Sequence, residues 1–477
     1  MKTVFEKSVS SRRGVVFGAA GKNPVAEKYL RKEAPALPEL SELDVVRHYT
    51  NLSRRNFSVD THFYPLGSCT MKYNPKINEK VSSLAGFSGL HPMTAYVSPK
   101  DCQGALEVLH KASELLAEIT GMKKITTQPY AGAHGELTGV LLTAAYHKQK
   151  GNKKTHIIVS ESAHGTNPAS AAMGGYDVVS VPVDSGGETD IEAFKAAINS
   201  ETAAVMMTVP STLGVFERRI KEVSQIAASH DALMYYDGAN LNAIMGKVRP
   251  GDVGFDIVHM NLHKTFSTPH GGGGPGSGVV GVSEKLADFL PSPVTMEKEG
   301  AYHLDFNIQH TIGRVASFFG NFGVILKAYA YILMLGREGL IDASEKAVLN
   351  ANYIMEKLKG IYHLPYDRVC GHECVFTAKN QMKHGVHAID IAKALIDRGF
   401  HPPTVYFPLV VEEAIMIEPT ETESKQEIDL FIEAMKEIAA LCETEPEKIK
   451  NAPLTMPVLR PDETKAAREL RLTCELP

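Results

Sequence analysis

The sequence predicts an α/β fold, with a mainly parallel β-sheet in a large domain and a smaller α+β domain after it. Strand-like β-branched runs alternate with helical patterns from about residue 106 to about residue 314, which is typical of a parallel sheet with crossover helices. Most of these runs end in polar or glycine-rich residues. The chain has 477 residues, a length that usually divides into two or three domains.

The candidate strands of the large domain indicate where a site would form. They are residues 155–160, 178–183, 203–210, 232–237 and 256–261. Open α/β sheets bind their ligands just beyond the carboxyl ends of the strands. We therefore expect the functional residues in the segments that follow these runs.

Three domains are predicted along the chain. Residues 1–75 are irregular, with a loop-like stretch at 62–75, and suggest an arm that wraps a neighbour. Residues 76–330 form the large domain and residues 331–477 the small one, in which 374–378 and 414–420 are strand-like. The apolar stretch 315–336 is predicted to be a buried helix, because Asn321 and Lys327 inside it would be costly in lipid.

Composition narrows the class of function. The formal net charge is -5 and no long Lys/Arg block occurs, which argues against a nucleic acid or an anionic membrane as partner. Six cysteines are too sparse for a disulfide scaffold and favour a reducing compartment. The N-terminal residues lack the apolar core of a signal peptide. We expect a cytoplasmic protein with a small-molecule or protein substrate.

The most informative segment is HMNLHKTFSTPHGGGGPGSG, residues 259–278, in which an apolar strand runs into Lys264 and then into glycines. A lysine at the end of a strand can be partly desolvated, which lowers its pKa and frees its amine to condense with an aldehyde. The glycines at 271–274 let the backbone approach a ligand closely. A lysine taken alone is far more often a surface residue near a turn, and a glycine run alone also suits a plain hinge.

Three further features suit one cofactor, pyridoxal phosphate (PLP). Asp237 ends the run ALMYYD, where a carboxylate keeps a pyridine nitrogen protonated, although it also suits a turn cap. His164 follows THIIVS and can lie against the ring or simply cap a helix. The loop TTQPYAGAHGELTGVLL, residues 126–142, is predicted to open a helix at about Glu136, whose N-terminus suits a phosphate. Together with Lys264, these signals predict a PLP site.

Several long strings also resemble one family. They are NLHKTFSTPHGGGGPG, PLGSCTMKYNP, SAHGTNPASAAM, HPPTVYFPLVVEEAIMIEPTE and DGANLNAI. The chain is similar from about residue 62 to about residue 460 to the glycine decarboxylase (P-protein) of the glycine cleavage system, in the C-terminal half that carries the PLP lysine. The resemblance implies PLP-dependent transferase fold type I, which is aspartate-aminotransferase-like, and subunit 2 of a split enzyme.

The resemblance also implies roles for individual residues. Lys264 would hold PLP as a Schiff base, Asp237 would face the pyridine nitrogen and His164 would stack on the ring. Further lining residues would be Asn240, His263, Ala133, His134, Gly135 and Glu136.

The implied activity is decarboxylation of glycine with transfer of the aminomethyl group to the lipoyl group of the H-protein. The implied partners are a homologous subunit 1, the lipoylated H-protein and the T- and L-proteins of the system. Two alternatives remain at this point: a non-catalytic half that keeps only the fold, and another PLP reaction on the same fold. A degenerate half would have no reason to retain Lys264, Asp237 and His164 together.

No metal site is expected. The string CGHEC, residues 370–374, lacks the second matching cysteine pair that a zinc site needs. His259 and His263 lie four apart in a strand-like run, so they would not share a helix face. Cys69 is a candidate reactive thiol without further support.

Overall fold

The computed structural model describes residues 2–15, 21, 25–33, 35–271, 273–470 and 472. Gly272, one glycine of the run that follows Lys264, lies outside the described residues. The chain forms two compact units, one of Met1–Thr61 with Pro457–Pro477 and one of His62–Met456. The predicted domain boundaries at 75 and 330 therefore remain predictions.

The smaller unit contains short helices. They are η1 (Glu27–Tyr29), α1 (Glu42–Ser53) and α14 (Glu463–Arg468). Helix α1 begins at a capping box, in which the Ser41 side chain accepts from the Asp44 amide and the Asp44 side chain accepts from the Ser41 amide. The expected irregular arm thus contains a helix, and the Ser-x-x-Asp pattern is the local signal for it.

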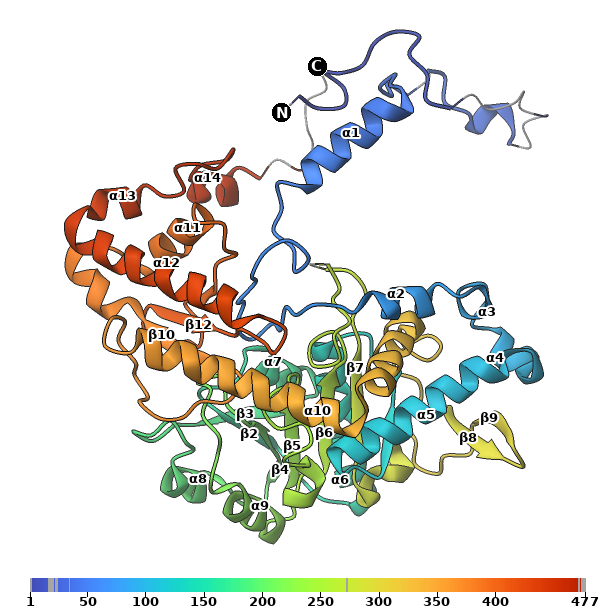
Figure 1. The fold of residues 1–477 in the computed structure, drawn as a ribbon. Helices are drawn as coiled ribbons and strands as arrows, with labels where there is room; N and C mark the ends of the chain where they lie inside the picture. The colour runs from blue at the N-terminus through green and yellow to red at the C-terminus, as the bar shows by residue number, and fades with distance from the viewer. Residues whose placement is uncertain are drawn as a thin grey trace. The chain divides into compact units, whose positions relative to one another are not determined.

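The larger unit is built on a seven-stranded sheet with the order β1-β7-β6-β5-β4-β2-β3 (Figure 1). Its strands are β1 (Lys124–Thr126), β2 (His156–Ser160), β3 (Asp177–Val181), β4 (Thr202–Thr208), β5 (Leu233–Gly238), β6 (Ile257–Asn261) and β7 (Gly278–Val282). The five predicted strands match β2 to β6, which pair in parallel. Strands β1 and β7 were not predicted, and both pair antiparallel.

Residue alternation along the strands explains why helices cover both faces of this sheet. Leu233 and Tyr235 belong to a buried cluster with residues of helix α6, whereas Met234 and Tyr236 belong to a second buried cluster with residues of helix α5. Successive side chains of a strand point to opposite faces, so β5 is buried on both. The residue after Tyr236, Asp237, therefore lies on the same face of the sheet as Leu233 and Tyr235.

The helices and short helical turns of the larger unit follow in chain order. They are α2 (Lys76–Ser82), α3 (Ala85–Ser88), α4 (Thr94–Val97), η2 (Pro99–Cys102), α5 (Gln103–Thr120), α6 (Gly132–Lys150), α7 (Thr166–Met173), α8 (Ile191–Ala197), α9 (Ile220–Ser229), η3 (Pro250–Val253), η4 (Glu284–Phe289), α10 (Phe322–Leu358), η5 (Ala378–His384), α11 (Ala388–Ile396), α12 (Lys425–Thr444) and α13 (Pro446–Lys450). No helix of the described residues combines the length and apolarity that crossing a membrane requires.

Two helix predictions need correction. Helix α10 begins at Phe322, so residues 315–321 of the apolar stretch are not helical, and its backbone leaves the helical conformation at Gly336 (φ 62°). Helix α6 begins at Gly132 rather than near Glu136. Glycine is a poor helix former, which hid this first turn from a propensity argument.

A second layer follows helix α10. Strands β10 (Cys374–Thr377), β12 (Ala414–Ile417) and β11 (Thr404–Val405) form an antiparallel sheet in the order β10-β12-β11, and the predicted strand-like runs 374–378 and 414–420 contain two of them. Helices α11 and α12 pack with this sheet around one apolar cluster. A hairpin of β8 (Val294–Lys298) and β9 (Ala301–Asp305) extends from the large sheet's side of the unit.

Candidate active site

The carboxyl ends of β5 and β6 bring two polar side chains together. Asp237 and His259 are direct partners in the parallel register of these strands. Asp237 has the parity of Tyr235, and His259 that of Ile257, so both lie on the face covered by α6. His259 Nε2 lies 3.3 Å from Asp237 Oδ1, and both side chains are almost fully buried.

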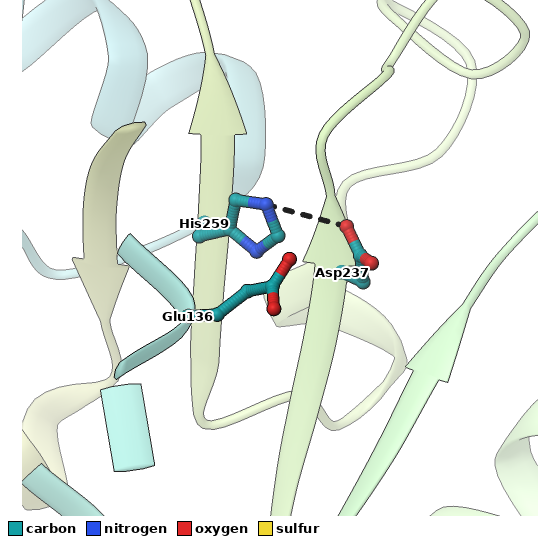
Figure 2. A group of neighbouring side chains, drawn as sticks. All are labelled: Glu136, Asp237 and His259. Atoms are coloured by element: carbon teal, nitrogen blue, oxygen red, sulfur yellow. Dashed lines mark ion pairs between the residues drawn. The ribbon is translucent and has the colours of Figure 1, made fainter. Parts of the chain in front are cut away.

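Glu136 reaches the same point from the first turns of α6. Figure 2 shows its carboxylate between the His259 ring and Asp237. One ligand-type atom from each of these three residues lies within 4.8 Å of the others. Glu136 also accepts hydrogen bonds from Thr166 Oγ1 at 2.7 Å and Ser170 Oγ at 3.1 Å, so two hydroxyls of α7 fix its carboxylate.

The two neighbouring carboxylates have opposite pKa shifts. Burial and the negative charge of Asp237 raise the pKa of Glu136 to about 7. The pKa of Asp237 is lowered, because the opposing effects of His259, the Ala239 amide and Lys264 outweigh burial. The arrangement therefore favours the state in which Asp237 is ionised and Glu136 carries the proton of the pair.

His259 is fixed by a second partner behind it. Tyr235 Oη lies 2.9 Å from His259 Nδ1, and burial raises the pKa of this phenol well above its usual range. Burial also lowers the pKa of His259, with Asp237 acting in the opposite sense. Tyr235 therefore holds the His259 ring with its Nε2 facing the Asp237 carboxylate.

Lys264 lies in the turn directly after β6. Its side chain is partly buried, and Nζ donates to the Ser68 carbonyl at 2.7 Å. Its charge acts on Asp237 and Glu136, lowering the pKa of each. The predicted lysine and the predicted aspartate thus share one edge of the sheet.

His164 also faces this edge. It lies between β2 and α7, where Thr166 N donates to its Nδ1 at 3.3 Å and Thr166 Oγ1 lies 2.9 Å away. Burial lowers the pKa of His164, with Asp237 raising it and Lys264 lowering it. Thr166 links this ring to Glu136, so His164 and the Glu136 carboxylate belong to one hydrogen-bonded group.

The remaining predicted residues divide into two sets. Asn240 donates to Thr70 and to Glu418 beside the lysine turn. His263 accepts from the Ser277 amide at 3.2 Å, and burial lowers its pKa to about 3, so it is a neutral support of the glycine-rich loop. The other set turns away: His134 contacts Tyr130 and Val315, and Ala133 is exposed.

The start of α6 offers a phosphate site. Its N-cap residue, Ala131, makes no side-chain capping bond, so the first amides of this helix lack a side-chain partner. A Cβ on Gly135 would lie 2.4 Å from the Gly278 carbonyl, and one on Gly132 would lie 2.8 Å from Asn261. Glycine therefore allows the helix start to approach the ends of β6 and β7, beside Lys264.

An unpartnered side chain adds to the fit with PLP. Asn167 is fully buried on α7, and neither of its amide atoms has a hydrogen-bond partner in the described structure. A buried amide without a partner is costly, and a bound ring with polar substituents satisfies such a group. The carboxylate, imidazole, amine and helix start therefore fit PLP.

Comparison with known proteins gives the family. The chain is 54% identical over 475 residues to the probable glycine dehydrogenase (decarboxylating) subunit 2 of Kosmotoga olearia, covering 98% of each protein. It is 56% identical over 443 residues to the protein of the same name from Caldanaerobacter subterraneus, covering 93% of this chain and 91% of that one. The chain belongs to the glycine dehydrogenase (decarboxylating) subunit 2 family. The resemblance predicted from sequence strings is confirmed.

One family model agrees with this family, and a second family model and the solved structures agree with the fold. The model of the glycine dehydrogenase C-terminal domain matches residues 343–456, and the aminotransferase class-V model matches residues 132–303. An inhibitor-bound glycine decarboxylase (P-protein) of the glycine cleavage system superposes with a TM-score of 0.70 at 21% identity, covering 87% of this chain and 92% of that one. A cysteine desulfurase from Thermococcus onnurineus superposes with a TM-score of 0.58 at 17% identity, covering 80% and 95%. The predicted fold type I architecture is confirmed.

Sequence reasoning missed His259, Asn167, Glu373 and Glu418. His259 sits inside an apolar strand, and only the β5–β6 register places it against Asp237. Asn167 follows His164 by three residues in SAHGTNPAS, so the site motif itself contained the signal. Glu373 and Glu418 reach the lysine turn from the second layer of the fold, which no local pattern indicates.

Proposed function

We propose that this chain is the catalytic, PLP-binding subunit of a glycine decarboxylase. In this proposal it removes CO2 from glycine and transfers the aminomethyl group to the lipoyl group of the H-protein. The observation that supports it most is the convergence of Lys264, Asp237 and the α6 N-terminus at one sheet edge. A half that retained only the fold would not need this charged, buried arrangement.

Each residue has a role defined by its surroundings. Lys264 attaches the cofactor, and the amides at the start of α6 bind its phosphate. Asp237 keeps the proton on the ring nitrogen, because its carboxylate stays ionised between His259 and the Ala239 amide. When bound, PLP accepts the electron pair that remains on the α-carbon of glycine after CO2 leaves. His164 packs against the ring from the side of β2.

Glu136 adds a proton-holding group beside Asp237. With a pKa of about 7 it carries a shared proton at neutral pH, and Thr166 Oγ1 and Ser170 Oγ keep its carboxylate in place. A second full negative charge beside Asp237 would favour protonation of one of the pair. Glu136 therefore lets Asp237 be the ionised partner of the ring nitrogen.

The proposal includes partners. The printed name of the relatives, subunit 2, implies a subunit 1. We propose that the counterpart is homologous to this chain and that the lipoylated H-protein accepts the aminomethyl group. The T- and L-proteins then act on the product, and the whole system is cytoplasmic.

Mixing experiments test this function. The purified chain should bind PLP, exchange labelled CO2 into glycine efficiently only with subunit 1, and turn over fully only with lipoylated H-protein. Borohydride reduction and peptide mapping should place the cofactor on Lys264, and Lys264→Ala should lose the visible absorbance. Full lipoyl-dependent turnover by the isolated chain as a homodimer, or the adduct on another lysine, would contradict the proposal.

A further inference from the structure

Residues 66–74, which we call the strap, cross the lysine turn and accept its amine. Lys264 Nζ donates to the Ser68 carbonyl at 2.7 Å. Ser68 has a left-handed backbone (φ 64°), which is unusual for a residue other than glycine and requires support from its surroundings. The strap is thus built to aim one carbonyl at Lys264.

The support comes from the small sheet. Glu373 Oε2 accepts from the Ser68 amide at 2.9 Å, and the Gly67 carbonyl accepts from Thr404 Oγ1 at 2.7 Å. Leu66 forms a bridge with Ile417 of β12. A Cβ on Gly67 would lie 2.2 Å from Met416 Cγ, so only glycine allows the strap to lie this close to the strand. These contacts fix the Ser68 carbonyl before any ligand binds.

Two buried carboxylates surround this carbonyl. Glu418 Oε1 accepts from Thr70, Asn240 and Asn242, while its Oε2 has no hydrogen-bond partner in the described structure. Burial raises the pKa of Glu418 to about 7 and raises that of Glu373, and the charge of Lys264 acts against both rises. His372 Nε2 lies 3.8 Å from Glu373 Oε2, whereas the Lys264 ammonium is the cation whose charge acts on both carboxylates.

The same geometry argues against a metal ion here. Ligand-type atoms of His372, Glu373 and Glu418 lie within 4.8 Å of one another. A divalent cation at this point would repel the Lys264 ammonium, and Oε1 of Glu418 and Oε2 of Glu373 already accept hydrogen bonds. The carboxylates of Glu373 and Glu418 are better explained as the negatively charged surroundings of the Lys264 amine.

In the proposed function, on which this inference rests, glycine replaces Lys264 on the cofactor. The released lysine amine then needs a binding place of its own. The C=N bond to Lys264 breaks and one to the glycine nitrogen forms. With the imine nitrogen protonated before and after the exchange, the glycine ammonium gives up two protons, both of which end on the Lys264 nitrogen, so charge and hydrogens balance without another donor. Lys264 leaves as an ammonium, which needs acceptors and a negative environment.

We propose that the Ser68 carbonyl, held by Glu373 and backed by Glu418, is the resting site of the Lys264 ammonium while glycine occupies the cofactor. Glu373 and Glu418 are positioning residues in this scheme. They stabilise the released lysine and thereby favour the glycine-bound state over the lysine-bound one.

The test is a glycine titration followed by the visible spectrum of the PLP-loaded complex. Glu373→Gln keeps an oxygen for the Ser68 amide but removes the charge, and Glu418→Gln keeps Oε1 and removes the second charge. Each should leave the resting spectrum unchanged and raise the glycine concentration for half-maximal change about tenfold, because the released ammonium loses one neighbouring negative charge. In the cofactor-free complex at pH 7, acetic anhydride should label Lys264 about tenfold faster in each Gln variant than in wild type. Each labelling rate is measured relative to that of the exposed Lys123.

Two matched variants separate charge from mechanical support. Glu413→Gln removes a carboxylate of the same layer that binds the Ala388 amide, and it should change neither readout. Thr404→Val removes a strap anchor without changing charge, so an effect as large as that of Glu373→Gln would overturn the electrostatic role. Half-saturation and labelling within twofold of wild type in both Gln variants would also overturn it. If wild type shows no glycine-dependent spectral change, the proposed function fails, and the labelling result still decides this inference.

Discussion

Replacing Asp237 with Asn isolates the charge of the ring-nitrogen partner. The change preserves side-chain shape, and the Asn oxygen can still accept from the Ala239 amide, which donates to Asp237 Oδ1 at 3.0 Å. Asp237 lies 3% exposed, so the lost charge is not replaced by water. We expect PLP to remain bound and decarboxylation to slow strongly.

The magnitude follows from simple electrostatics. Opposite charges about 4 Å apart interact by about 4 kcal/mol at the effective dielectric constant of about 20 that suits protein sites. Because one factor of ten in rate corresponds to about 1.4 kcal/mol, the loss is roughly a thousandfold. The pKa of Glu136 should fall at the same time, since the charge of Asp237 is one of the causes that raise it.

The assay is exchange of labelled CO2 into glycine, measured in the assembled complex with cofactor occupancy determined separately. Asp256→Asn is the matched control, because Asp256 is also a buried carboxylate, but it lies just before β6 and accepts from the Met234 amide of β5. It should retain the exchange rate. Near wild-type exchange by Asp237→Asn at full occupancy would refute the reasoning and assign the ring nitrogen to another group.

Two predictions concern stability. Burial raises the pKa of Glu418 to about 7 in the folded chain from an ordinary 4.5, so the stability linked to its proton is present below pH 4.5 and is lost as pH rises toward 7. The urea midpoints of the cofactor-free chain at pH 5 and pH 8 should therefore differ less in Glu418→Gln than in wild type. An unchanged difference would contradict this prediction. Lys72 and Glu421 form a buried ion pair at 2.6 Å, so Lys72→Met should lower the unfolding free energy by about 3–5 kcal/mol. Lys327 pairs with Glu79 at a more exposed position, so Lys327→Met should lower it by at most about 1 kcal/mol. Equal urea midpoints for these two variants would show that the Lys72 pair contributes no more than a surface pair.

The sequence predicted those parts of the fold that depend on local residue patterns. Strands β2 to β6 were found because β-branched runs end in polar residues, and Asp237 and Lys264 were found because each follows such a run. Strand β7 was missed because it follows the glycine-rich loop directly, and its sequence GVVGV contains two glycines that lower its strand propensity. Strand β1, with three residues, is too short to produce a pattern.

Other features of the site depend on contacts between distant segments. The strap contacts Glu373 and Glu418 across more than 300 residues of chain, and the pairing emerges only when β10 and β12 form a sheet. The sequence contained both partners, in PLGSCTMKYNP and in AIMIEPT, but no spacing rule connects them. Such residues become visible only once the tertiary structure places them beside the lysine.

The start of α6 shows how a shift of four residues changes a chemical role. With the helix beginning near Glu136, this side chain would lie at the phosphate end, where a carboxylate would repel a dianion. With the helix beginning at Gly132, the amides at 132–134, which have no side-chain cap, would face the phosphate in the proposed site, and Glu136 lies one helical turn further in, buried near Asp237. In the proposed site, the corrected boundary therefore places Glu136 beside Asp237 and away from the phosphate. Its raised pKa follows from that position, because burial and the charge of Asp237 both raise it.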